Sequence, residues 1–307
     1  MHPFVENDQF TQVWDDGACP HFWPIGDRHI LPFFSHKSGG QYLLGDYDKD
    51  RDKFFATAHG LFNFGAIFEP GAVLAPSATP DGEGGVIVIF NMAPAKPTEG
   101  WNQVMSLPRR LTLLSKNELG MEPAGNIKSL RYNHQHIDAR TLPANEEIVL
   151  EHIKGNAMEM RVEIDPGEAP VIELNVLRSP NKEEYTRISF FKQRGYRDWE
   201  RYSGWQEKRW VEAKSSLIML ESSRSSILPD VLSRPPETGP FYFEPNQPLQ
   251  LRIFIDKSVV EVFANNRQCV AMRVYPGLKE SVGVSLRSQG QDSQLLSLDA
   301  WQMKSIY

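Results

Sequence analysis

Turn-forming residues recur along the whole of this 307-residue chain and limit how long any regular element can be. The 22 glycines and 22 prolines are spread through the sequence instead of being gathered in one linker. Short apolar segments lie between them, and aromatic residues make up 11% of the composition. This pattern is typical of an all-β protein built from many short strands.

Short strands separated by turns are predicted in the first third of the chain. The predicted strands cover residues 29–35, 41–47 and 84–90, with turns at 37–40 and 80–82. This spacing is compatible with propeller blades, a sandwich or a barrel. Residues 113–126 are polar and show no clear strand alternation, so we place a domain boundary there or near Asn133. A short helical piece is expected at residues 127–132.

The second half of the chain contains clear two-residue alternation of apolar and polar side chains. The predicted strands cover residues 147–150, 157–164, 171–177, 187–191, 249–256, 259–264, 270–275 and 282–286. Lys257 and Ser258 form a two-residue hairpin turn between two of them. So many strands in about 170 residues predict a β-sandwich.

Charge and apolar patterning exclude several classes of partner. The net charge of −6 provides no basic surplus for a nucleic acid, and no apolar run approaches the roughly 20 residues of a membrane helix. Cys19 and Cys269 form no disulfide framework and favour a reducing compartment such as the cytoplasm. The first ten residues show no signal-peptide pattern. No cofactor is expected, and a homo-oligomer is left open.

Two stretches resemble metal sites but do not complete one. Residues 46–52 are rich in aspartate, yet Arg51 and Thr57 occupy the places where an EF-hand needs glycine and a carboxylate. His134 and His136 would share one face of a strand, but the sequence places no third ligand beside them. We interpret them as surface or hydrogen-bonded histidines and expect no metal.

The loop before Trp23 carries the candidate catalytic residues. Asp15 and Asp16 precede the sequence Gly-Ala-Cys-Pro and the aromatic pair Phe22 and Trp23. Cleavage of a glycosidic bond usually needs two carboxyl groups, and adjacent residues of an extended chain point to opposite faces. At most one of the two aspartates can therefore serve, and a polar turn is the alternative.

Several side chains near these acids are candidates for contact with a substrate. Cys19, Phe22 and Trp23 adjoin the acidic loop, and Trp101 could form a stacking platform for a sugar or a core position. A tryptophan-rich, charged stretch at residues 194–208, followed by Trp210, is interpreted as an exposed loop region of uncertain purpose.

Taken together, several stretches resemble glycoside hydrolase family 32, the group of invertases, inulinases and levanases. GACPHFWPIG is similar to the Trp-Glu-Cys-Pro-Asp acid/base segment, and GWNQVMSLPRRLTL is similar to the last propeller blade. LRIFIDKSVVEVFANN followed by MRVYP matches the terminal sandwich hairpin. The resemblance implies a five-bladed β-propeller followed by a β-sandwich, and retaining hydrolysis of β-fructofuranosides. We expect a partial propeller over 1–125, a linker over 126–136 and a sandwich over 137–307.

The departures from this family pattern concern the catalytic groups. The nucleophile segment Trp-Met-Asn-Asp-Pro-Asn-Gly and the Arg-Asp-Pro motif do not occur in the sequence, and Ala18 stands at the acid/base glutamate. Gly-Ala-Val-Leu-Ala at residues 71–75 stands where the family has a Gly-Asp-Phe-Tyr-Ala segment, so a polar contact to the sugar is also missing. Asp16 is preferred over Asp15 as a substitute for the missing proton donor. It lies two positions before Ala18, and on an extended strand residues two apart share a face.

We therefore expect an inactive or impaired glycosidase that takes a carbohydrate as its substrate or ligand. Either the chain is the C-terminal piece of a longer protein or its lineage has lost or changed the activity. The alternatives are a carbohydrate-binding module without catalysis and a structural sandwich.

Overall fold

The structure, a computed structural model, describes residues 4–6, 8–65, 70–194, 215–244 and 246–306. Within these ranges the regular elements are β-strands and one 3-10 turn, η1 (Ile127–Leu130), which lies where a short helical piece is predicted. No helix in the described part of the chain has the length and apolar character needed to cross a bilayer. Trp199, Trp205 and Trp210 of the tryptophan-rich stretch lie outside the described residues.

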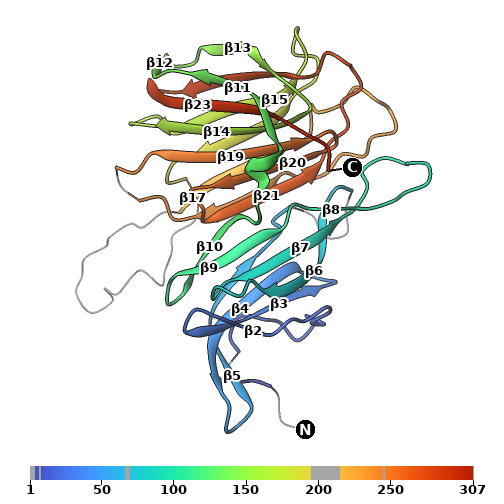
Figure 1. Ribbon diagram of the computed structural model, residues 1–307, viewed down its shortest axis with the longest axis vertical. Helices are drawn as coiled ribbons and strands as arrows, with labels where there is room; N and C mark the ends of the chain where they lie inside the picture. The colour runs from blue at the N-terminus through green and yellow to red at the C-terminus, as the bar shows by residue number, and fades with distance from the viewer. Residues whose placement is uncertain (1–3, 7, 66–69, 195–214, 245, 307) are drawn as a thin grey trace.

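Two sheets form the N-terminal part of the molecule (Figure 1). The first sheet has the order β1-β5-β4-β3-β2. Its strands are β1 (Val5–Glu6), β2 (Trp23–Ile25), β3 (Arg28–Ser35), β4 (Gly39–Asp48) and β5 (Lys53–Leu61). The second sheet has the order β10-β9-β7-β6, with β8 paired to β7. Its strands are β6 (Val73–Pro80), β7 (Val86–Met92), β8 (Val104–Met105), β9 (Arg109–Ser115) and β10 (Glu118–Pro123).

Alternation of apolar side chains gives the first sheet two buried faces. Neighbouring residues of a strand point to opposite faces, and Leu43 and Leu44 accordingly belong to different cores. Leu44 packs with Ile30 and with Val88 of the second sheet. Leu43 packs with Phe54 on the opposite face. The first sheet is thus covered on both sides.

Residues 113–126, where the sequence shows no clear strand alternation and where we place a domain boundary, contain regular strands. β9 and β10 form an antiparallel hairpin there, with Leu111 opposite Met121. Its turn is Lys116–Asn117, and polar residues on either side of that turn conceal the alternation. Leu111, Leu119 and Met121 are buried and hold the hairpin on the core.

Two larger sheets form the C-terminal part. The third sheet has the order β11-β23-β14-β19-β20-β21, with β12 paired to β23. Its strands are β11 (Arg131–Ile137), β12 (Arg140–Leu142), β14 (Ala157–Asp165), β19 (Leu249–Asp256), β20 (Val259–Ala264), β21 (Gln268–Arg273) and β23 (Ser293–Met303). The fourth sheet has the order β13-β22-β15-β16-β17-β18. Its strands are β13 (Glu147–Lys154), β15 (Val171–Arg178), β16 (Thr186–Phe191), β17 (Ser216–Glu221), β18 (Glu237–Phe241) and β22 (Gly283–Gln289).

The strands predicted from alternation are found in these two sheets, most of them within two residues at each end. The third and fourth sheets contribute side chains to one apolar core, for example Ile253 from β19 and Leu174 from β15. β11 occupies much of the predicted linker at 126–136 and pairs with β23.

The third sheet also joins the N-terminal part of the molecule. Phe254 of β19 and Phe263 of β20 pack into the core shared by the first two sheets. Figure 1 shows β10 lying next to β21 at the junction of the two parts, and β10 also contacts β20. The first two sheets are therefore fixed against the outer face of the third.

Candidate functional site

The acidic loop that precedes β2 is attached to the edge of β3. The amide of Ala18 donates to the carbonyl of Phe34, and the amide of Phe34 donates to the carbonyl of Ala18, both at 2.7 Å. Gly17 has φ +59° and Cys19 has φ +50°. The chain is therefore not extended between Asp16 and Ala18, and the prediction of a shared strand face is wrong. Asp16 is placed by other contacts.

Asp16 is held by His36, the residue that directly follows β3. The His36 amide donates to Asp16 Oδ1 at 2.9 Å, and His36 Nδ1 contacts Oδ2 of the same carboxylate. The backbone and side-chain hydrogen bonds from His36 lower the pKa of Asp16 below its ordinary value. A general acid needs a pKa near the working pH, so the shift runs against proton donation. The Asp16 carboxylate is a charged acceptor that is 45% exposed.

Asp15 begins a chain of polar contacts that leads into the first sheet. Its Oδ2 accepts from the amide of Gln12 at 2.8 Å, and its Oδ1 accepts from the Ser38 hydroxyl. Burial raises the pKa of Asp15, but these hydrogen bonds outweigh it and the pKa is lowered overall. Ser38 Oγ in turn accepts from Gln41 Nε2 at 2.7 Å. Gln41 Oε1 lies 2.6 Å from Nε2 of His59.

His59 ends this chain of contacts on β5. Burial lowers the pKa of His59, although the charges of Asp15 and Asp8 act in the opposite direction. The ring of Phe10 stacks on it with centroids 6.1 Å apart. A neutral imidazole with acidic neighbours can donate or accept a hydrogen bond at neutral pH.

Sequence reasoning missed Asp8, Ser38, Gln41 and His59 as neighbours of Asp15. Ser38 lies in the turn just before β4, Gln41 lies near the start of β4, and His59 lies on the paired strand β5. No local pattern marks them, because only strand pairing brings these positions to the loop. The arrangement can accept hydrogen bonds from the hydroxyl groups of a polar ligand.

The predicted aromatic contacts near the loop are used mainly within the protein. Phe22 stacks on His29 at 5.0 Å and meets Phe4 edge-on at 5.0 Å. Trp23 donates its indole N–H to the carbonyl of Ala78 at 3.0 Å and packs against the shared core.

Cys19 and Trp101 have more accessible side chains. Cys19 is an exposed free thiol beside Ala18. Trp101, in the segment between β7 and β8, is 46% exposed, and the guanidinium of Arg273 lies 5.0 Å from its ring centroid. Trp101 contacts the third sheet through Arg273, and Cys19, Phe22, Trp23 and Trp101 stay predictions as substrate contacts.

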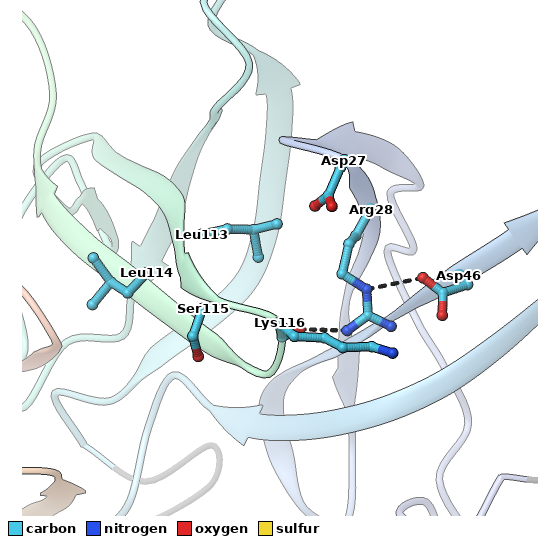
Figure 2. Close-up of a pocket in the computed structure, with 7 residues that line it drawn as sticks. All are labelled: Asp27, Arg28, Asp46, Leu113, Leu114, Ser115 and Lys116. Atoms are coloured by element: carbon cyan, nitrogen blue, oxygen red, sulfur yellow. Dashed lines mark hydrogen bonds and ion pairs between the residues drawn. The ribbon is translucent and has the colours of Figure 1, made fainter.

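A pocket of about 440 Å³ lies at another place, between the β2–β3 turn and the β9–β10 hairpin. Figure 2 shows Arg28 among the lining residues, bonded to Asp46 and to the carbonyl of Lys116. Arg28 also donates to Thr57 Oγ1 at 2.8 Å and is only 3% exposed. These contacts tie the two N-terminal sheets together, and none of the predicted site residues lines the pocket.

One group of three potential metal ligands occurs among the described residues, on the third sheet. His134 and His136 of β11 both lie next to Asp299 of β23. Both histidines are hydrogen-bonded surface residues, as interpreted from the sequence. Their shared partner, Asp299, could not be placed from the sequence.

Comparison with known families identifies the C-terminal part of the chain. Residues 126–302, more than half of the chain, match the family model described as glycosyl hydrolases family 32 C terminal. Fructan 1-exohydrolase IIa from Cichorium intybus has a similar structure, with a TM-score of 0.78 at 17% identity over 94% of this chain and 62% of that chain. A variant of that enzyme has been solved in complex with 1-kestose, with the same TM-score.

Curated relatives are similar over nearly the whole of this chain. The insoluble β-fructofuranosidase isoenzyme CWINV1 of Arabidopsis thaliana is 25% identical over 360 residues, covering 95% of this chain and 59% of the relative. Sucrose-6-phosphate hydrolase of Escherichia coli is 28% identical over 290 residues, covering 88% and 51% respectively. The chain thus spans between about half and three-fifths of the length of these relatives.

Proposed function

Because the chain belongs to glycosyl hydrolase family 32, we propose that it recognises β-fructofuranosides and that it hydrolyses them poorly or not at all as an isolated chain. The matched relatives include a β-fructofuranosidase, a fructan 6-exohydrolase and a levanase. The 1-kestose complex of the chicory enzyme supports an oligofructoside as the ligand class.

The same proposal gives the four sheets their architectural roles. The first and second sheets are blades of a partial propeller over residues 1–125, and a β-sandwich over 137–307 follows. Its first strand, β11, already begins within the proposed linker at 126–136. The strand orders β5-β4-β3-β2 and β10-β9-β7-β6 support this assignment, since each proceeds from strand to neighbouring strand as a blade does. The core shared by the third and fourth sheets supports the sandwich.

Impaired hydrolysis follows from the carboxyl groups at the acidic loop. A retaining glycosidase needs one carboxyl group to protonate the leaving oxygen and a second to attack the sugar. The resemblance places the proton donor at Ala18, whose methyl group cannot transfer a proton. Asp15 and Asp16 both have lowered pKa values and hold their charge through hydrogen bonds. The alanine at position 18 is the observation that carries the proposal.

A direct assay of fructose release tests it. The purified chain is incubated with sucrose, 1-kestose and inulin, and free fructose is measured beside an active family 32 enzyme. Loss of general acid catalysis alone typically lowers a rate by about 10²–10⁴-fold, so we expect release at least about 100-fold below that of the control. Release at the rate of the control enzyme would overturn the proposal.

Binding without cleavage is the second candidate function. The rings of Trp14 and Trp101 are 57% and 46% exposed, and the charged carboxylates of Asp15 and Asp16 can accept hydrogen bonds from sugar hydroxyls. Retention on a fructan gel without release of fructose would support this function. If the chain is not retained on the gel and releases no fructose, a structural role is favoured.

A further inference from the structure

A cluster on the third sheet has the donor atoms of a transition-metal site, although no part of the proposed carbohydrate function uses it. The cluster consists of Nε2 of His134, Nδ1 of His136 and a carboxylate oxygen of Asp299, all within 4.8 Å of one another. Nε2 of His134 lies 2.7 Å from Asp299 Oδ1, and Nδ1 of His136 lies 2.8 Å from the same oxygen. Two nitrogen donors thus converge on one carboxylate oxygen.

The strand geometry explains how residues 165 and 163 positions apart come together. His136 is directly paired with Asp299 across the β11–β23 ladder, while the register shifts between Tyr132 and Gln135. Asn133 lies in this irregular part with φ +51°. A bulge of this kind adds a residue to one strand and re-aims its side chains. Here it brings the His134 ring to the carboxylate that His136 already faces.

Two further side chains orient the imidazole rings. The indole ring of Trp301 stacks on His134 with centroids 4.9 Å apart and an interplanar angle of 12°. Oδ1 of Asp138 lies 3.5 Å from Nε2 of His136. A metal-binding histidine usually gives its second ring nitrogen to a carboxylate, which leaves the first nitrogen free to bind the metal. The placement of Asp138 leaves Nδ1 of His136 facing Asp299.

We propose that His134, His136 and Asp299 bind a divalent transition-metal ion, with Zn²⁺, Cu²⁺ and Ni²⁺ as the chemical class. Two imidazoles and one carboxylate form a donor set suited to these ions, with a water molecule as a further ligand. A tetrahedral ion with bonds of about 2.0–2.2 Å separates its ligand atoms by about 3.3–3.5 Å. Each histidine nitrogen needs to move away from Asp299 Oδ1 by roughly 0.5–0.8 Å. The two histidines are 50% and 44% exposed.

The surrounding charges permit a cation at this place. Asp299 and Asp138 supply two negative charges. Three arginines lie close by: Arg131, over the ring of Trp301, and Arg161 and Arg252 beside it. All three contact the buried carboxylate of Glu159, so with Asp299 and Asp138 the anions and cations around the site are equal in number. A bound ion would connect β11 to β23 and stabilise the strand that begins the C-terminal part.

Calorimetric titration of the untagged, chelator-treated full chain with Zn²⁺ tests the proposal. We expect one ion per chain, and no measurable binding at the same concentrations for His134→Asn, His136→Asn or Asp299→Asn. Asp138→Asn should weaken binding by about 10-fold, the lower limit for loss of an outer partner. His152→Asn changes an exposed histidine of β13 and should bind as the unchanged chain does.

A second measurement keeps the test independent of folding defects. Cu²⁺ should quench the fluorescence of Trp301, excess Zn²⁺ should reverse the quenching, and Trp301→Phe should remove that part of the signal. Variants are compared only if their metal-free thermal unfolding matches that of the unchanged chain. No binding by the unchanged chain overturns the proposal, as does equal binding by the His134→Asn/His136→Asn double variant.

Discussion

Arg109 and Glu261 form an ion pair across the junction between the second and third sheets, with Nη2 and Oε2 3.0 Å apart and both side chains fully buried. The other carboxylate oxygen of Glu261 accepts from the amide of Leu107 at 2.5 Å. The Arg109 guanidinium also lies over the ring of Phe90 at 5.0 Å. Arg109 comes from the Leu-Pro-Arg stretch and Glu261 from the terminal hairpin, the two stretches that most clearly carry the family resemblance.

Removing either member of this pair should strongly destabilise the chain. Arg109→Met or Glu261→Gln leaves its partner buried without a counter-charge, which typically costs about 3–5 kcal/mol. The double variant Arg109→Met/Glu261→Leu should recover much of that loss, because no buried charge is left. Urea unfolding measures these changes in the free energy of unfolding.

An exposed ion pair supplies the matched control. Arg51 contacts Glu6 at 2.9 Å and is 53% exposed. Arg51→Gln should change the free energy of unfolding by less than about 1 kcal/mol, as is usual for surface pairs. Equal effects of Arg51→Gln and Arg109→Met would contradict a special role for the buried pair.

Restoring a carboxyl group at position 18 should not by itself produce hydrolysis. Ala18→Glu puts an acid where the family has its proton donor, but retaining hydrolysis still needs a second carboxyl group beside the sugar. We expect fructose release from sucrose to stay at the level of the unchanged chain, with circular dichroism showing that the variant is folded. A gain of about 100-fold would mean that a second catalytic carboxyl group is already in place, and that our assignment of the acidic loop is incomplete.

Acid should weaken the C-terminal part through Glu147. Burial raises the pKa of Glu147, but hydrogen bonds from Arg178, Ser285 and Lys182 outweigh it and lower the pKa to about 2. A carboxyl group with a lowered pKa in the folded state stabilises the fold above its ordinary pKa of 4.5. That contribution is lost as the pH falls from about 4.5 towards 2.

The variant Glu147→Gln measures this contribution. It should be less stable than the unchanged chain at pH 7, and the difference in unfolding free energy should shrink as the pH is lowered towards 2. Glu151→Gln, an exposed change on the same strand, is the control. A stability difference that stays constant from pH 7 to pH 2 would rule out the linkage.

The two cysteines should differ sharply in reactivity. Cys19 is exposed, whereas Cys269 is buried and burial raises its pKa to about 12, against the opposing effect of Arg109. Because the thiolate is the reactive form, a thiol reagent should modify one cysteine in the folded chain and two in denaturant. Mass spectrometry of the modified peptides should identify Cys19 as the first. Rapid modification of Cys269 under native conditions would show that its surroundings open readily.

Strands with regular alternation could be predicted from the sequence, and those whose pattern is interrupted could not. Leu249–Asp256 and Val259–Ala264 were located with their correct bounds, because β-branched residues alternate on both sides of a two-residue turn. β11, with the sequence RYNHQHI, was missed because its polar side chains lie on the outer surface and only its pairing with β23 defines it.

The candidate site was predicted only in part for a similar reason. The sequence draws attention to Asp15 and Asp16 but does not show what holds them. Their partners Ser38 and His36 are about 20 residues away and are set by the pairing of the loop with β3. Gly17, with its positive φ, bends the loop where an extended strand was expected. Hydrogen-bond partners of this kind depend on tertiary structure and leave no local signal.

The core that receives Phe254 and Phe263 makes the two parts of this protein poor interchangeable modules. Side chains from the first three sheets fill one apolar volume, so each part completes the packing of the other. A chimera made by joining the N-terminal part of one relative to the C-terminal part of another would have to match these contact surfaces as well as the connecting peptide. Substitutions in the core residues of one part therefore limit which substitutions the other part can tolerate.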